Sequence, residues 1–96
     1  MYAVFAEVNA DESHIEAARD FLPKAAVPMA REAGAKAGYW LAPQNGRGVS
    51  VVIYATEDEA RAVAARTEVG KPPPIPDPPA GLTVKTVEVR EVLASL

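Results

Sequence analysis

The segment Lys36–Thr56, KAGYWLAPQNGRGVSVVIYAT, predicts two β-strands joined by a tight turn. Asn45 and Gly46 mark the turn, because both residues tolerate the positive φ angles that a two-residue type I′ turn requires. Residues 36–42 and 48–56 on either side are rich in the aromatic and β-branched side chains that favour strands. We therefore expect the rest of the chain to fold around a β-hairpin.

The register of this hairpin decides which side chains share a face of the sheet. A two-residue turn places Gln44 opposite Arg47. The same register places Trp40 opposite Val51. We expect the helices to cover the drier face, formed by Gly38, Trp40, Ala42, Val49, Val51, Ile53 and Ala55. The other face is expected to carry Tyr39, Leu41, Ser50, Val52, Tyr54 and Thr56. An error of one residue in the register would exchange the two faces of one strand.

The part of the chain before the hairpin predicts a strand and a long helix. Residues 2–8 (YAVFAEV) are aromatic and β-branched, as in a strand. Residues 14–33 carry apolar side chains at steps of three and four, which is typical of an amphipathic helix. These are Ile15, Ala18, Leu22, Ala25, Met29 and Ala33. Because an interior proline removes a helical hydrogen bond, Pro23 and Pro28 predict a kink or a restart, which we place at Pro28. Gly34 is expected to end the helix.

The part after the hairpin predicts a second helix and a fourth strand. Thr56 and Glu59 form a capping-box pattern, and the helix is expected to run to about Thr67. Its inward positions are expected to be Ala60, Val63 and Ala64, and its outward ones Arg61 and Arg66. Residues 82–92 (LTVKTVEVREV) predict the strand. Its alternation slips after Val84, which indicates a β-bulge.

The loop Lys71–Gly81, KPPPIPDPPAG, holds most of the prolines of the chain. So many prolines exclude a helix or a central strand. Two PxxP spacings, from Pro73 to Pro76 and from Pro76 to Pro79, are typical of polyproline ligands. A stiff connector needs only the same residues, and we favour that interpretation for residues 72–79.

The element order β-α-β-β-α-β predicts an α+β fold. Right-handed crossovers give a four-stranded antiparallel sheet with two helices on one face, the ferredoxin-like arrangement. The 96 residues are expected to form one domain, 1–96. On the uncovered face we expect Tyr39, Leu41, Val52 and Tyr54, joined by Tyr2 and Val4. An apolar face of this size is unusual on a monomer, so we expect a homodimer in which two sheets pack together.

Composition and charge exclude several classes of protein. Hydrophobic residues make up 49% of the chain and charged ones 24%, which is typical of a soluble globular domain. The formal net charge is −3 and the cations are scattered, which argues against a nucleic-acid partner. No apolar stretch reaches the roughly 20 residues of a membrane span, and we expect a cytoplasmic protein. The absence of cysteine excludes disulfides and Cys-based metal sites.

Several short motifs are shared with a known family. They are Met1-Tyr2-Ala3, Pro28 with Arg31-Glu32-Ala33-Gly34, Gly38-Tyr39-Trp40-Leu41, Gly48-Val49-Ser50-Val51, Tyr54-x-Thr56-x-x-Glu59-Ala60, and Val87-Glu88-Val89. With them the chain resembles the dimeric α+β barrel superfamily, in its antibiotic-biosynthesis-monooxygenase-like branch. The resemblance covers nearly the whole chain, but its motifs are mostly structural, so it indicates fold and dimerisation better than chemistry.

The resemblance implies a choice of functions and a place for the site. Some members resemble cofactor-free oxygenases that convert aromatic phenols to quinones, others degrade haem, and many are small proteins without an established activity. The family cavity usually lies between sheet and helices. This chain has Tyr54 where the family often has tryptophan. It has no histidine on the second helix, where haem-degrading relatives place their iron ligand, and this argues against haem degradation.

Five residues are candidates for a site. Asn9, His14 and Tyr54 are the candidate catalytic residues, and Trp40 and Phe5 the candidate ligand-binding residues. Structural roles compete: core packing for Trp40, interface packing for Tyr54, helix entry for Asn9 and an exposed helical turn for His14. No second neutral nitrogen or thiol accompanies the one histidine, so no metal site is expected.

Two functions stay open on the sequence. The preferred one is a small dimeric protein that binds a small apolar or aromatic ligand without catalysis, because no dense group of polar residues is evident. The alternative is a cofactor-independent monooxygenase acting on an electron-rich aromatic, of the phenol-to-quinone type. There the substrate carbanion would itself react with dioxygen, and the protein would supply a dry cavity, a proton acceptor and hydrogen bonds. Neither function calls for a cofactor.

Overall fold

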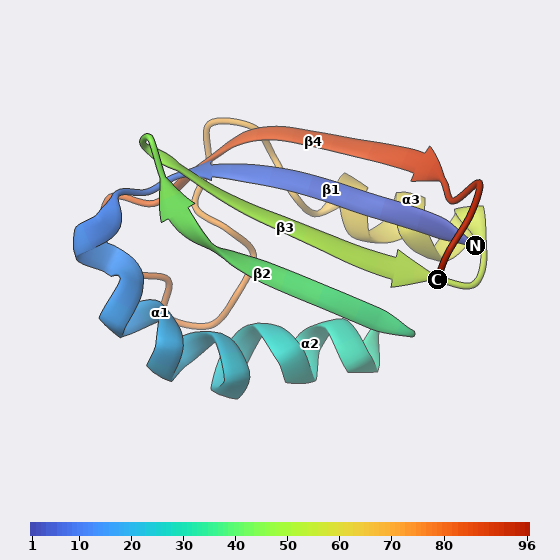
Figure 1. The fold of residues 1–96 in the computed structure, drawn as a ribbon, viewed down its shortest axis with the longest axis horizontal. Coiled ribbons are helices and arrows are strands. Elements are labelled where there is room, and N and C mark those ends of the chain that lie inside the picture. The colour runs from blue at the N-terminus through green and yellow to red at the C-terminus, as the bar shows by residue number, and fades with distance from the viewer.

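A computed structural model describes all residues, 1–96, as an α+β fold with one four-stranded antiparallel sheet (Figure 1). The elements are β1 (Tyr2–Asn9), a 3-10 turn (Glu12–His14), α1 (Ile15–Phe21), a π-helical turn (Leu22–Ala26), α2 (Val27–Glu32), β2 (Ala37–Gln44), β3 (Arg47–Tyr54), α3 (Glu57–Ala65) and β4 (Thr83–Glu91). The strand order is β2-β3-β1-β4, with every neighbouring pair antiparallel, which is consistent with a ferredoxin-like arrangement. None of the helices combines the length and the hydrophobicity that a transmembrane span needs.

The predicted hairpin turn is confirmed, but the register of the strands behind it was predicted wrongly. Asn45 and Gly46 have φ angles of 55° and 77°, and Gln44 faces Arg47 as expected. Between Gln44 and Leu41 the pairing shifts by one residue, because β2 contains a bulge there. Trp40 consequently lies opposite Ser50 and not opposite Val51.

Pro43 gives the physical reason for the bulge. A proline has no N–H to donate to a strand ladder, so inside a sheet it is confined to edge strands and bulges. β2 is an edge strand, and Pro43 lies within its irregular part, directly before Gln44. Gly48 on β3 lies in the same region, where an added Cβ would come within 3.0 Å of Val8 Cγ2. Proline and glycine together favour a shifted register over a regular ladder.

The shift exchanges the two faces of β3. The core cluster on the helix side consists of Val4, Val52, Tyr54 and Ala60, and Tyr2 packs against it. The prediction that Tyr2, Val4, Val52 and Tyr54 lie on the uncovered face is therefore wrong. Strand alternation places the following residues on the face without helices, which we call the open face: Ala3, Phe5, Tyr39, Leu41, Val49, Val51 and Ile53. Tyr39 was assigned to it correctly, whereas Leu41 and Val49 also border the hollow between the sheet and the helices that is described below.

The long helical segment is interrupted by a π-helical turn that contains Pro23, and not at Pro28, where the interruption was expected. Leu22–Ala26 forms a π-helical turn in which the N–H of Val27 donates to the carbonyl of Leu22. α2 then begins with Pro28 in its first turn, where the missing proline N–H costs no helical hydrogen bond. Gly34, with a φ angle of 100°, ends the segment, and the N–H of Ala35 donates to the carbonyl of Ala30 at 2.9 Å.

The second helix and the last strand follow the prediction closely. The Thr56 hydroxyl accepts from the N–H of Glu59 at 3.2 Å, and the Glu59 carboxylate accepts from the N–H of Thr56 at 3.3 Å. α3 ends at Ala65, two residues before the expected end. In β4 the pairing with β1 shifts at Lys85, which is the bulge expected after Val84.

The capping box yields a stability prediction. We expect Thr56→Ala to lower the free energy of unfolding by about 1 kcal/mol, because the N–H of Glu59 loses its acceptor at the start of α3. Thr56→Ser keeps the hydroxyl and should lose much less. Urea denaturation followed by circular dichroism measures both. Equal losses in the two variants would contradict a role for the hydroxyl bond.

Candidate functional site

A cavity of about 540 Å³ lies between the sheet and the helices. It exists because the two helical layers sit differently on the sheet. α3 packs closely on β1, β3 and β4, whereas α1, the π-helical turn and α2 make no comparably close approach to any strand. Figure 1 shows α1 and α2 running together below the strands and α3 lying apart from them, behind the sheet. The cavity is the space that this uneven packing leaves between the sheet and the helices.

Small side chains on both surfaces keep this space open. On the helical side the cavity is lined by Ala18, Ala26, Ala30 and Ala33, and on the sheet by Ala6, Gly48 and Ser50. A helical stripe of alanines facing a strand with glycine and serine removes the side-chain volume that would otherwise fill such a layer. The larger residues Phe21, Leu22 and Met29 stand at the sides of the cavity. The cavity thus results from the lack of large residues at facing positions of the helices and the sheet.

The proline-rich loop closes one end of the cavity. Pro73, Pro74 and Ile75 are lining residues, together with Ala18 of α1. In Figure 1 the loop between α3 and β4 passes behind the strands toward α1. Its position gives the loop a role as a wall, which agrees with a stiff connector. Polyproline recognition of a partner stays an untested alternative.

Three of the five candidate residues meet in the cavity. Trp40, Tyr54 and His14 are all lining residues, although they come from β2, β3 and the first helical turn. Phe5 does not line it, because β1 alternation turns Phe5 to the open face, opposite Val51. Phe5 therefore lies outside this cavity, and a role for it in ligand binding stays a prediction.

Asn9 also stays outside the cavity. Its side-chain Nδ2 donates to Thr83 Oγ1 at 2.9 Å and so ties the end of β1 to the start of β4. Asp11, and not Asn9, is the N-cap of the first helical turn. Asn9 is thus neither a cavity residue nor the helix cap.

His14 is held by the helix that it opens. Its Nδ1 accepts from the N–H of Asp11 at 3.2 Å and completes a capping box in which Asp11 Oδ1 accepts from the N–H of Ser13 at 2.8 Å. Hydrogen bonds from Ser13 lower the pKa of the Asp11 carboxyl. The same Nδ1 lies 3.2 Å from Asp11 Oδ1, so contacts with Asp11 engage this nitrogen at the start of the helix. This geometry suits a cap better than a general base. No three His, Cys, Asp or Glu side chains gather closely enough to hold a metal ion.

Tyr54 is the most deeply enclosed polar residue of the cavity, with 1% of its surface exposed. Burial raises the pKa of its phenol above the ordinary value, while the nearby Arg66 lowers it and Glu59 raises it further. The net direction is upward, so the hydroxyl stays protonated and is available as a hydrogen-bond donor.

Four further polar residues, which the sequence did not single out, border the cavity. They are Ser50, Glu32, Arg66 and Thr67. Ser50 was assigned to the open face, and recognising the bulge at Pro43 would have turned it inward. Arg66 is exposed, as predicted, but it lies beyond the end of α3 next to Thr67 and so reaches the rim of the cavity.

The raised pKa of Tyr54 predicts how stability depends on pH. Below pH 10.0, the ordinary phenol pKa, Tyr54 is neutral in both the folded and the unfolded state. Above it the unfolded state loses the proton first, so the free energy of unfolding should fall until the folded phenol also ionises. In urea denaturation, the free energy of unfolding of Tyr54→Phe should fall less between about pH 9 and pH 11, the range around the ordinary phenol pKa. Tyr39→Phe, at an exposed site, is the control, and parallel curves for all three proteins would contradict the expectation.

Comparison with known proteins adds no relative to this geometry. No protein-family model, no curated protein and no solved structure matches the chain. The likeness to the dimeric α+β barrel superfamily therefore stays a prediction that rests on the short motifs quoted above. We accordingly take the function from the chemistry of the cavity and of the open face.

Proposed function

We propose that the protein is a homodimer that binds a small apolar or aromatic molecule in the cavity between sheet and helices, without turning it over. The observation that carries this proposal is the cavity itself. Its volume of about 540 Å³ lies within the roughly 300–1,000 Å³ of small-molecule sites. Twenty of its 29 lining residues are hydrophobic, which suits a ligand with a mostly apolar body.

The aromatic preference rests on Trp40. Its indole is half-buried and forms part of the cavity wall, where an offset stack with a planar ligand adds to simple burial. Binding is favoured over catalysis because the polar groups are few and His14 already serves as a cap. A general base needs a free lone pair within hydrogen-bond reach of its substrate. Nδ1 of His14 has none to offer.

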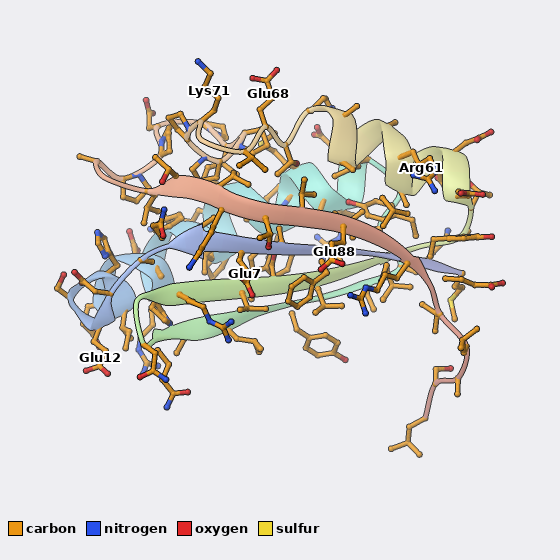
Figure 2. All side chains as sticks on the ribbon, turned by 90° about the horizontal axis from the view of Figure 1, so that it is seen from above. Glu7, Glu12, Arg61, Glu68, Lys71 and Glu88 are labelled. Atoms are coloured by element: carbon orange, nitrogen blue, oxygen red, sulfur yellow. The ribbon has the colours of Figure 1, made fainter.

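Dimerisation rests on the open face. Phe5, Val51 and Ile53 form its centre, and Tyr39 on the edge strand is 65% exposed. Charged residues border this apolar area along β4 and the ends of β1 and β3: Glu7, Arg47, Glu88 and Arg90. Figure 2 shows Glu7 and Glu88 on the side of the sheet away from α3. An apolar centre with a charged rim is the usual anatomy of a protein interface.

Tyr39→Glu tests the proposed interface. In sedimentation velocity the unmodified chain should have the mass of a dimer. The variant should be a monomer, because burying an unpaired carboxylate costs about 2–5 kcal/mol of association free energy. Val69→Glu introduces the same charge at another exposed hydrophobic residue, 61% exposed beyond the end of α3, and should remain dimeric. A monomeric unmodified chain, or equal behaviour of the two variants, would overturn this part of the proposal.

Ala30→Phe tests the cavity. The neutral probe N-phenyl-1-naphthylamine should bind with a saturable rise in emission and take up energy from Trp40, the only tryptophan. Phenylalanine at position 30 would occupy the space in front of the sheet, so probe emission should fall close to that of free probe while the melting temperature holds or rises. Ala62→Phe, at an exposed position of α3, should bind like the unmodified chain. Failure of the probe to bind, or binding unaffected by Ala30→Phe, would remove the basis of the proposal.

A cofactor-independent monooxygenase acting on an electron-rich aromatic is the second candidate. It is favoured by one observation: Trp40, Tyr54 and His14 border the same apolar cavity. Oxygen consumption with dihydroxyaromatic and anthrone substrates separates it from pure binding. Consumption that is lost in Ala30→Phe and kept in Ala62→Phe would establish turnover in this cavity. Without any consumption over the free substrate, ligand binding alone stands.

A further inference from the structure

The polar groups of the cavity differ in whether they are already engaged. Nδ1 of His14 accepts from the backbone of Asp11, and the Thr67 hydroxyl donates to the carbonyl of Val63 at 3.0 Å. Four lining residues have side chains that take no part in the hydrogen bonds or ion pairs of the chain: Glu32, Ser50, Tyr54 and Arg66. Two are neutral hydroxyls on β3, and two are opposite charges on exposed residues at the rim. A ligand in the cavity would meet these groups.

Five of the ten cations of the chain have no carboxylate within 4 Å, and of these only Arg66 borders the cavity. Arg19, Lys24, Arg47, Arg61 and Arg90 each lie within 4 Å of an acidic side chain, whereas Arg66 does not. It directly follows the last turn of α3, and it shares with Val63 and Thr67 the side of the chain that borders the cavity. A guanidinium presents parallel N–H donors that match the two oxygens of a carboxylate. Of the four free groups it is the one suited to a charged partner with a defined shape.

The field of Arg66 reaches into the cavity. Burial is the main reason why the pKa of Tyr54 is raised; Arg66 lowers this pKa and Glu59 raises it, whereas Glu32 is not among the groups that shift it. Tyr54 is nearly fully buried and turned toward the cavity, so the positive charge at the rim acts on the space that a ligand would fill. Arg66 is the only lysine or arginine that borders the cavity, so a negative group in the cavity is attracted to the rim at Arg66.

We infer that the ligand is an amphipathic acid, whose carboxylate is bound by Arg66 at the rim and whose apolar body lies against Trp40. The inference rests on the proposed binding function and narrows its ligand class. The hydroxyls of Tyr54 and Ser50 then supply hydrogen bonds to polar atoms along the body of the ligand. Glu32 on the facing helix disfavours a second negative group, so a monocarboxylate fits better than a diacid.

A matched pair of probes tests this inference. 2-Naphthoate and 2-naphthamide have nearly the same shape and differ in charge, and isothermal titration calorimetry gives both affinities. The unmodified chain should bind the carboxylate about tenfold tighter than the amide, as a charge-assisted bidentate contact would require. Arg66→Gln should bring the two affinities within about twofold of each other by lowering only that of the carboxylate. Arg66→Lys keeps the charge and should retain part of the preference.

Two controls separate a local contact from a general effect of net charge. Arg61→Gln removes the same charge from α3 at a residue that pairs with Glu57 and does not line the cavity, so the preference should stay. Glu32→Gln should tighten naphthoate binding, because it removes the negative charge that lies at the rim of the cavity. Melting temperatures of all variants verify that each is folded.

The outcomes distinguish the inference from the function on which it rests. Equal affinity for the two probes, a preference that survives Arg66→Gln, or one that Arg61→Gln lowers equally would overturn the carboxylate site and leave apolar ligand binding intact. If neither probe binds, and N-phenyl-1-naphthylamine does not bind either, both fall together. The assignment is supported if naphthoate binds more tightly than naphthamide only to the proteins that carry a cation at position 66.

Discussion

The register between β2 and β3 controls the chemistry of both faces of the sheet. One proline decides it, because Pro43 cannot donate to the ladder and an edge strand relieves that defect most easily with a bulge. From the bulge onward, Ser50, Val52 and Tyr54 turn toward the helices and Val51 and Ile53 turn away. A regular ladder would have placed a buried phenol outside and a row of valines against the helices. The cavity would then have had no polar group on its β3 floor.

Small side chains on both surfaces create the cavity, and the cavity leaves the helical layer unevenly supported on the sheet. α3 is anchored through Ala60, which is fully buried against the core cluster. The α1–α2 segment contacts the same cluster only through small, partly buried side chains, Ala30 and Ala33. An unfilled apolar cavity forgoes the contacts that filled cores make, so a ligand that binds only the folded state stabilises this half of the molecule directly. The π-helical turn between two prolines adds a further weak point to the same segment.

Local signals in the sequence were sufficient for the elements and insufficient for the site. Asn45-Gly46, the capping box at Thr56 and the slip after Val84 each depend on neighbours in the chain, and the structure has all three. The register was predicted wrongly because the turn was taken to fix the pairing along the whole ladder, although Pro43 stands within the first of the two strands. Alternation in β1 did not show which side faces the helices, because this strand has apolar side chains on both faces. Arg66 was seen as a solvated charge, since no local pattern shows that the far end of α3 borders a hollow formed by distant alanines.

The pattern of apolar and polar residues differs among the four strands. This difference indicates which part of the sheet a second copy of the chain would cover. An antiparallel strand with one wet face alternates between apolar and polar residues, and β4 does so: Val87 and Val89 face the helices while Glu88 and Arg90 face outward. β3 does not alternate, because Val49, Val51 and Ile53 on the open face are as apolar as Val52 on the other. A strand that is apolar on both faces is typical of one buried on both faces. The region that a second copy would cover therefore centres on β3 with β1 and β2. β4 would stay at its wet margin, where the ion pair between Arg90 and Glu88 would cost no desolvation.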